Sequence, residues 1–412
     1  MGNRPCAQGE GGKRGWRGRS RRLGRHGIGE RRVRTRRSGA ADTAVDSVLG
    51  QRALNRALLA RQMLLGREQR GALESIEHLG GMQAQVPSNP YLGLWSRLED
   101  FDPEAISQLI AQRELVRPTL MRTTIHLVSA RDCLLWRPLL QPLMARTLSS
   151  TAWGKQIKGV DHDALIATGR ALLEEQPRSR AELGPLLKAH WPDVDAAALA
   201  WAVSYLVPVV QVPPRGLWGT SGRARVTTVE AWLGRPLASD PSPDEMVMRY
   251  LGAFGPASSG DVRTWSGVAG LREVIARLRP RLMTFRDERG RELFDLPDAP
   301  RPDPATPAPP RFLPEYDNIL LGHDDRTRII PSNTGLSIPA GRGGEYGSVL
   351  VDGFLGAMWR ITRERDRAML TIETSGAWSA ANRAGVADEG ARMLAFLAAD
   401  AADHDVRFMA SG

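Results

Sequence analysis

The sequence predicts an α+β protein built from three tandem winged helix-turn-helix units and a C-terminal mixed β-rich domain. Two stretches in the middle of the chain repeat one plan, in which three helical patterns precede a strand, a turn and a second strand. A looser version of this plan, with extra helices, fits residues 48–150. Seven prolines in residues 297–312 predict an extended linker, and strand patterns dominate the residues that follow.

Length and composition narrow the class of protein. A chain of 412 residues, 42% hydrophobic and 25% charged, is typical of a globular protein with about three domains. The sequence has no apolar run of the roughly 18 residues that a membrane span needs. Cys6 and Cys133 are too few for a disulfide scaffold. We therefore expect a cytoplasmic protein, associated with the nucleoid if it binds DNA.

The net charge of +10 is concentrated in one tail. Residues 1–40 contain 13 Lys and Arg against Glu10 and Glu30, so the remaining chain is nearly neutral. Residues 1–45 have almost no periodic apolar pattern, which predicts disorder. This segment is either an arm that binds nucleic acid or translated leader upstream of the true start. Any basic surface on the folded body must come from how its residues are arranged.

Helical spacing and breaker residues predict the first unit, residues 48–150. Apolar residues recur at helical spacing from Leu54 to Leu64, and a second helix over 72–79 ends at Gly80-Gly81. Two prolines disfavour helical angles in residues 83–90, so this segment is extended up to a short helix that Ser88 or Asn89 caps. The next predicted elements are a helix over 102–112, a strand-like stretch over 115–128 and a helix over 129–144.

Capping boxes mark the repeated plan in the second unit, residues 151–238, and the third, residues 239–298. Ser179 with Glu182, and Ser258 with Asp261, each predict the start of a helix. The other predicted helices cover 163–175, 196–206, 244–254 and 271–277, and the hairpin strands cover 207–212, 217–228, 282–285 and 292–296.

The linker and C-terminal mixed α/β domain occupy residues 299–412. Strands are predicted at 318–321, 328–330, 348–351, 357–361, 368–372 and 406–409, with a helix over 388–399.

Motifs for cofactor chemistry are missing from the sequence. It contains no Walker loop, no Gly-x-Gly-x-x-Gly and no Gly-x-Ser-x-Gly elbow. Its seven His include no i, i+4 pair, so we expect neither a metal nor another cofactor. We interpret His323-Asp324-Asp325 as a solvated turn, and Trp218 and Trp265 as core residues.

Two segments are locally basic and favour DNA as the partner. Residues 110–147 carry six Arg against two acids, and residues 272–292 carry seven Arg against four acids. Arg binds phosphate oxygens in pairs, and both segments include or flank a predicted hairpin. The alternative interpretation is that each run is an ordinary solvated face.

Gln83-Ala84-Gln85 is the candidate catalytic motif. In an extended segment, side chains two residues apart point to the same side, so the two amides could share one small target. Each amide offers one acceptor oxygen and two donors, which suits the positioning of a water molecule. Amides do not ionise, so the chemistry is limited to a reaction that needs little proton abstraction. The alternative is that both are ordinary surface residues.

Gly81-Met82-Gln83-Ala84-Gln85, followed by Pro87 and Asn89-Pro90-Tyr91, resembles the Gln-x-Gln motif of the AlkZ-like winged-helix DNA glycosylases, which are linked to self-resistance against azinomycin-type alkylators. Residues 54–62, 117–128, 313–318 and 351–354 match further segments of that family. The resemblance runs from about Val48 to near the C-terminus. A related branch has Asp at the second motif position, so Gln85 favours the azinomycin-type branch.

The resemblance implies a monofunctional DNA glycosylase that hydrolyses the N-glycosidic bond of bulky or crosslinking N7-alkylguanine lesions. Gln83 and Gln85 would position the attacking water. The chain is expected to act as a monomer on double-stranded DNA that carries alkylated guanine. The expected DNA contacts are Arg56, Arg61, Asn89, Arg117, Arg122, Thr124, His126, Arg286 and Arg289.

Two alternatives remain open at this point. The whole chain could be a non-catalytic tandem winged-helix protein that binds DNA, for example as a regulator. His126, which lies between the apolar Ile125 and Leu127, could be a structural residue or a backbone contact, or it could take a direct part in catalysis.

Overall fold

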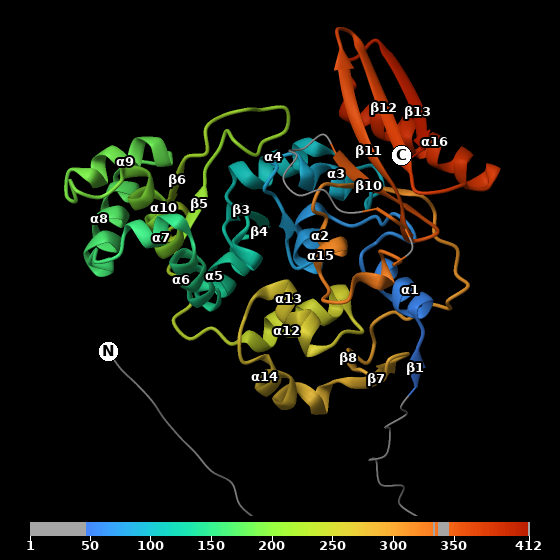
Figure 1. The fold of residues 1–412 in the computed structure, drawn as a ribbon, viewed down its shortest axis with the longest axis horizontal. Coiled ribbons are helices and arrows are strands. Elements are labelled where there is room, and N and C mark those ends of the chain that lie inside the picture. The colour runs from blue at the N-terminus through green and yellow to red at the C-terminus, as the bar shows by residue number, and fades with distance from the viewer. Residues whose placement is uncertain (1–46, 333, 337–345, 411–412) are drawn as a thin grey trace, which may run out of the picture. The chain divides into compact units, whose positions relative to one another are not determined.

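The described residues form both helices and strands, with long runs of successive helices, which confirms the predicted α+β class (Figure 1). The computed structural model describes residues 47–332, 334–336 and 346–410. The prediction of a disordered tail or a leader at residues 1–45 lies outside the described residues.

Residues 47–150 contain the predicted helices, with two local differences. Ser88 is the N-cap of a short helix that carries Pro90 in its first turn, but its side chain makes no capping hydrogen bond. The helix predicted over 129–144 is broken at Leu140, because Pro142 lacks the N–H that an uninterrupted helix would need and begins a new one. The elements here are β1 (Val48–Leu49), α1 (Gln51–Arg61), α2 (Ala72–His78), β2 (Met82–Gln83), α3 (Asn89–Trp95), α4 (Pro103–Ala111), β3 (Leu115–Pro118), β4 (His126–Ser129), α5 (Ala130–Leu139) and α6 (Gln141–Ser150).

Residues 151–298 contain both predicted capping boxes, Ser179 with Glu182 and Ser258 with Asp261. The strand predicted over 217–228 is much shorter, because residues 212–225 form a long connection between two strands of three residues each. The elements are α7 (Ala152–Gln156), α8 (His162–Glu175), α9 (Arg180–Lys188), α10 (Ala196–Leu206), β5 (Val209–Gln211), β6 (Val226–Thr228), α11 (Val229–Leu233), α12 (Pro243–Phe254), α13 (Ser259–Ser266), α14 (Leu271–Leu278), β7 (Met283–Asp287) and β8 (Glu292–Asp295).

Three helices therefore precede a two-stranded hairpin in each of these two stretches: α8 to α10 before β5–β6, and α12 to α14 before β7–β8. The assignment of three winged helix-turn-helix units, with the boundaries given above, stays a prediction.

Hairpins of the first and second predicted units share one sheet, which the sequence analysis did not foresee. The strand order is β2-β4-β3-β5-β6, and β3 pairs with β5 through Arg117 opposite Gln211 and Pro118 opposite Val210. This pairing joins strands about 90 residues apart in the chain. It places the β5–β6 connection near the segment that carries Gln83 and Gln85.

The C-terminal region is a five-stranded sheet with order β13-β12-β11-β10-β9, and α16 contacts it (Figure 1). Two predicted strands are wrong: residues 318–321 form a short helix that Asp317 caps, and residues 326–328 form a 3-10 turn that Asp325 caps. Local capping by Asp outweighs the apolar composition there. The elements are β9 (Arg311–Pro314), α15 (Asn318–Leu321), β10 (Tyr346–Val351), β11 (Phe354–Glu364), β12 (Arg367–Thr374), α16 (Ala380–Leu397) and β13 (Asp403–Ala410).

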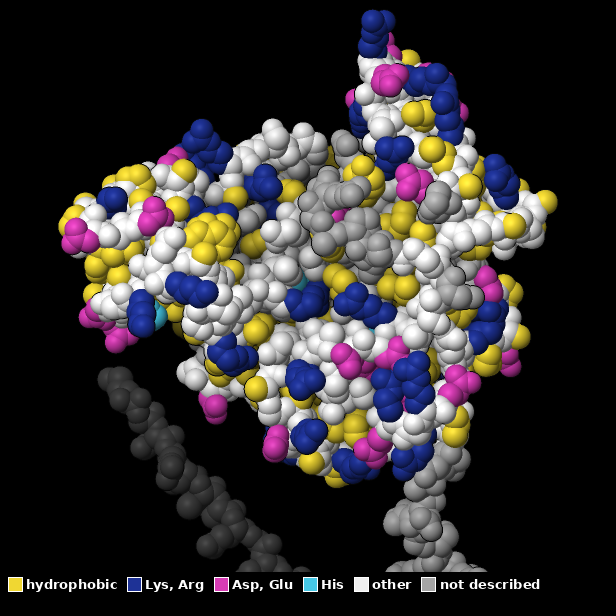
Figure 2. Space-filling view, in the orientation of Figure 1, with side chains coloured by type: hydrophobic (Ala, Val, Ile, Leu, Met, Phe, Trp, Pro, Cys, Tyr) yellow, Lys and Arg dark blue, Asp and Glu magenta, His cyan; other side chains and the backbone are white. Residues whose placement is uncertain are grey.

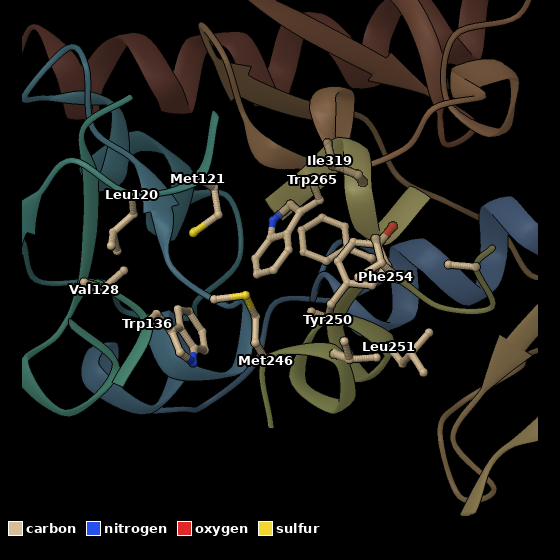
Figure 3. Packing of buried hydrophobic residues seen from close by; sticks show 14 of the residues in the cluster. Leu120, Met121, Val128, Trp136, Met246, Tyr250, Leu251, Phe254, Trp265 and Ile319 are labelled. Atoms are coloured by element: carbon tan, nitrogen blue, oxygen red, sulfur yellow. The ribbon is translucent and has the colours of Figure 1, made fainter. Parts of the chain in front are cut away.

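A central apolar cluster joins these regions (Figure 3). Trp136 from α5 packs edge-on against Trp265 from α13, with ring centroids 6.2 Å apart. Trp265 also contacts Tyr250 and Phe254 of α12, at 5.2 and 6.0 Å. The core position expected for Trp265 is confirmed, whereas Trp218 is only half-buried. Within the described ranges, no helix is both long and apolar enough to span a bilayer.

Gly81, which directly precedes β2, is required by the backbone. Its φ is +87°, and an added Cβ would lie 2.5 Å from Val128 Cγ1. Gly81→Ala should therefore lower the free energy of unfolding by about 2 kcal/mol, through backbone strain and overpacking. Denaturant unfolding measures the loss. Gly66→Ala is the matched control, since nothing lies within 4 Å of its added Cβ. Equal stability of the two variants would contradict this assignment.

Candidate active site

The two candidate glutamines lie on a short extended segment that follows α2. Gly80 and Gly81, both at positive φ, end the helix and begin β2. β2 pairs with β4 in antiparallel register, with Gln83 opposite His126, and the Ala84 N–H donates to the Ile125 carbonyl at 2.7 Å. Gln83 is 8% exposed, whereas Gln85 is open to solvent.

Hydrogen bonds determine which way each amide faces. Gln83 Oε1 accepts from Arg122 Nη2 at 2.9 Å, and Gln85 Oε1 accepts from the Ile125 N–H at 3.2 Å. Both partners can only donate, so flipping either amide would place its NH₂ group against another donor. Both side chains therefore turn their oxygens toward residues 122–126 and their NH₂ groups away from this segment.

Arg122 holds the inner amide from an unusual backbone position. Arg122 and Thr123 have φ of 54° and 60°, a left-handed conformation that is uncommon for two successive non-glycine residues. The guanidinium donates to the Trp265 carbonyl at 3.1 Å and to Asn318 Oδ1 at 3.0 Å, in addition to Gln83. Within the described ranges, Arg122 forms no ion pair. Burial, and secondly Arg326, lower its pKa to about 10, so the group is cationic at neutral pH.

Asn318 is a site residue whose role the sequence analysis missed. Its Nδ2 donates to the Gly81 carbonyl at 3.0 Å while its Oδ1 accepts from Arg122. The segment 313–318 was singled out only by resemblance, and a strand was predicted for residues 318–321. The helical cap at Asp317 directs Asn318 toward the motif instead. A cavity of about 10 Å³, close to the size of one water, is lined by Gln83, Asn318 and Asn89 among others.

His126 is enclosed by the protein and electrically neutral. Its side chain has no exposed surface, and its Nδ1–H donates to the Thr124 carbonyl at 3.0 Å, which leaves Nε2 as an acceptor 3.5 Å from Arg122 Nη2. Burial, and secondly the Arg122 charge, lower its pKa to about 3. In this structure the ring cannot reach a phosphate and carries no charge, which argues against the expected DNA contact. For the same reason it cannot serve as an acid at neutral pH.

Four other expected DNA contacts are structural, because their side chains are at most 4% exposed. Arg56 bonds to Asp352, and Arg61 forms a bidentate pair with Asp295 at 2.6 and 2.9 Å. Asn89 donates to the Glu315 carbonyl at 2.6 Å. Arg117 donates to the carbonyls of Ala84 at 2.9 Å and Arg215 at 3.1 Å, so it joins the backbone of the motif to the β5–β6 connection. The burial of these four side chains argues against the phosphate contacts expected for them.

The remaining expected contacts lie closer to solvent. Thr124 is half-buried and its hydroxyl donates to the Met121 carbonyl at 3.2 Å. Arg286 and Arg289 are exposed on the β7–β8 hairpin, where Arg289 pairs with Asp325 at 3.0 Å. Figure 2 shows basic and acidic side chains interspersed over this lower part of the molecule. These residues, and Arg122, stay predicted DNA contacts.

The His323-Asp324-Asp325 interpretation needs a partial correction. His323 is 1% exposed and bonds to the Phe254 carbonyl at 3.0 Å, so it is a core residue rather than part of a solvated turn. Asp324 is exposed as expected. Among the residues that the structure describes, no group of three or more His, Cys, Asp or Glu is placed to hold a metal ion.

Comparison with known proteins identifies the class. The model of the family described as DNA glycosylase AlkZ-like matches residues 76–396, which is well over half of the chain. The protein is therefore a DNA glycosylase, an enzyme of DNA repair, and it belongs to the AlkZ-like family. This membership favours the enzyme over the non-catalytic regulator considered above.

Two of the matches come from Streptomyces sahachiroi. A protein named interstrand DNA cross-link repair glycosylase is 26% identical over 333 residues, which cover 74% of this chain and 85% of that protein. The solved structure of the DNA glycosylase AlkZ has a TM-score of 0.64 at 20% identity, covering 88% of this chain and 100% of that one. The structural likeness shows a shared fold.

The neutrality of His126 makes a prediction for acid stability. A folded-state pKa of about 3, against about 6.5 in the unfolded chain, means that only the unfolded state takes up this proton between those values. This contribution to stability is complete above about pH 6.5 and is lost as the pH falls toward 3, by up to about 1.4 kcal/mol per pH unit. His126→Gln should make the acid dependence of the unfolding free energy correspondingly shallower. Exposed His162→Gln is the control, and identical slopes for wild type and His126→Gln would refute the assignment.

Proposed function

We propose that this DNA glycosylase hydrolyses the N-glycosidic bond of bulky or crosslinking N7-alkylguanine lesions and leaves an abasic site without cutting the strand. The observation that carries the proposal is a pair of uncharged amides, one on β2 and one two residues beyond it, whose orientation is determined by donor-only partners. The name of the Streptomyces sahachiroi relative supports a crosslinked substrate.

The chemistry of the lesion suits a site whose two amides have no acid among their described hydrogen-bond partners. Alkylation at N7 makes the guanine cationic, so the base leaves without protonation, and the sugar becomes oxocarbenium-like in the transition state. A weak nucleophile is then sufficient if it is held correctly. The partners of the two amides are the Arg122 guanidinium and a backbone N–H, neither of which transfers protons at neutral pH.

Gln83 and Gln85 would hold the attacking water between them. Each amide oxygen has a second lone pair that can accept a hydrogen from water, which turns the water's own lone pair toward C1′ of the sugar. Because Arg122 already uses one lone pair of Gln83, the oxygen that faces the developing positive charge is held in place before the reaction. The positive charge of Arg122 itself would be balanced by a phosphate of the bound DNA.

The protein would bind duplex DNA as a monomer, through the surface around the motif. Exposed Arg286 and Arg289, on the hairpin of the third predicted winged unit, and Thr124 beside the motif are the proposed backbone contacts. Such contacts set the register of the duplex, whereas the lesion is selected at the amides.

Replacing the amides tests the mechanism. With a duplex carrying N7-alkylguanine, and with alkali to reveal abasic sites, Gln83→Ala and Gln85→Ala should each slow base release by roughly 100-fold. DNA binding should persist, because neither side chain is a proposed phosphate contact. Gln112→Ala, exposed at the end of α4, is the matched control. Full activity in the double variant would exclude both residues from the mechanism.

Arg122 is the proposed positioning residue for Gln83. Lys is a point cation without the planar fork, so Arg122→Lys keeps the charge but cannot reach three acceptors at once. We expect kcat to fall roughly tenfold with a smaller change in KM, since the loss is in alignment of the water. Exposed Arg131→Lys provides the control. A change confined to KM, with a weaker dependence on salt, would indicate a phosphate contact only.

A further inference from the structure

Asn318 connects the Gln83-Ala84-Gln85 motif to the C-terminal half of the chain. Its Nδ2 donates to the Gly81 carbonyl at 3.0 Å, and its Oδ1 accepts from Arg122 Nη2 at 3.0 Å. The same Arg122 nitrogen donates to Gln83 Oε1 at 2.9 Å. One side chain therefore holds both the backbone that enters β2 and the cation that orients the Gln83 amide.

The two partners of Asn318 determine the orientation of its amide. The Gly81 carbonyl can only accept and the Arg122 guanidinium can only donate, so flipping the amide would place like groups against each other on both sides. The side chain is 6% exposed, so water has little access to either bond. Ionised Asp, which has the same length, only accepts, so it could not make both bonds at neutral pH.

The residues around Asn318 hold its backbone in place. Asp317 accepts from the Ile319 N–H at 3.1 Å, which caps α15, and it forms a bidentate ion pair with Arg97 at 2.8 and 2.9 Å. Both members of this pair are at most 5% exposed. Ile319 is buried in the central apolar cluster (Figure 3). A helix cap, a buried ion pair and the core therefore direct Asn318 toward the motif.

We propose that Asn318 is a positioning residue for base release and acts through Gln83. It holds the Gln83 amide by two routes, through Arg122 and through the Gly81 carbonyl. Loss of the Oδ1 acceptor would leave Arg122 Nη2 free to turn away from Gln83, and loss of the Nδ2 donor would release the peptide that leads into β2. The inference rests on the proposed function and adds to it a residue from the C-terminal half of the chain.

Single-turnover kinetics test this role. Asn318→Leu keeps the approximate size of the side chain and removes both hydrogen bonds. With the enzyme in excess over a duplex that carries N7-alkylguanine, base release should slow roughly tenfold, because the water is less well aligned. The Kd for the duplex should not change, since a side chain that is 6% exposed offers no DNA contact. Asn318→Asp keeps the acceptor for Arg122 but loses the donor to Gly81, so it should slow base release less.

A double-mutant cycle with Gln83→Ala separates positioning from general destabilisation. If Asn318 acts through Gln83, Asn318→Leu should cause little further loss once that amide is gone, because residues in one hydrogen-bond network act non-additively. An effect of the same size in both backgrounds would show a purely structural role and overturn the proposal. A wild-type rate of base release in folded Asn318→Leu would overturn it as well.

Asn55→Leu is the matched control for the loss of a buried amide. Asn55 is also enclosed by the protein, and its Nδ2 donates to the carbonyls of Arg328 and Gly353 at 2.8 and 2.7 Å. Neither partner belongs to the Gln83-Ala84-Gln85 motif. This variant should therefore lower the unfolding temperature without slowing base release. Thermal unfolding also identifies any variant that fails to fold, and Asn318→Asp then replaces Asn318→Leu in each experiment.

A crystal structure of Asn318→Leu distinguishes failure of this inference from failure of the proposed function. In the variant, the Gln83 amide should lose its hydrogen bond to Arg122 or take more than one orientation. An unchanged Gln83–Arg122 bond would overturn the inference. If the wild-type protein releases no base from N7-alkylguanine, the proposed function fails instead, while the variant structure still decides whether Asn318 orients Gln83.

Discussion

The site depends on one half-buried cation that makes no ion pair within the described part of the chain. Arg122 donates to Gln83, Trp265 and Asn318, which lie 39, 143 and 196 residues away in the sequence. Removing a charge from water is costly unless polar groups replace its hydration, and here carbonyl and amide oxygens do so. The same bonds orient Gln83, so the interactions that stabilise the cation also arrange the site.

Three of the six arginines expected as DNA contacts connect parts of the fold instead. Arg56, Arg61 and Arg117 each connect segments that are far apart in the chain, because one guanidinium can serve several acceptors at once. Arg97 does the same through a bidentate pair with Asp317, next to Asn318. The basic run at residues 110–147 is thus partly internal, and the body of the protein presents mixed charge in the view of Figure 2.

A site of neutral amides beside a neutral histidine is poorly suited to bases that need protonation in order to leave. It suits a lesion whose positive charge already weakens the glycosidic bond. Selectivity can then reside in the charge of the lesion and in the shape of the neighbouring surface.

Local sequence determined the helices, both capping boxes, the Gly80-Gly81 break and the extended segment with its two glutamines, because these depend on interactions between residues a few positions apart. Tertiary structure alone decided which arginines are exposed, since the half-buried Arg122 and the exposed Arg289 look alike in sequence. It also decided that Asn318, at the start of a short helix, bonds to Arg122 and to the Gly81 carbonyl, and that β3 pairs with β5. Those outcomes depend on contacts across 90 or more residues, where burial and pairing are determined by the whole fold.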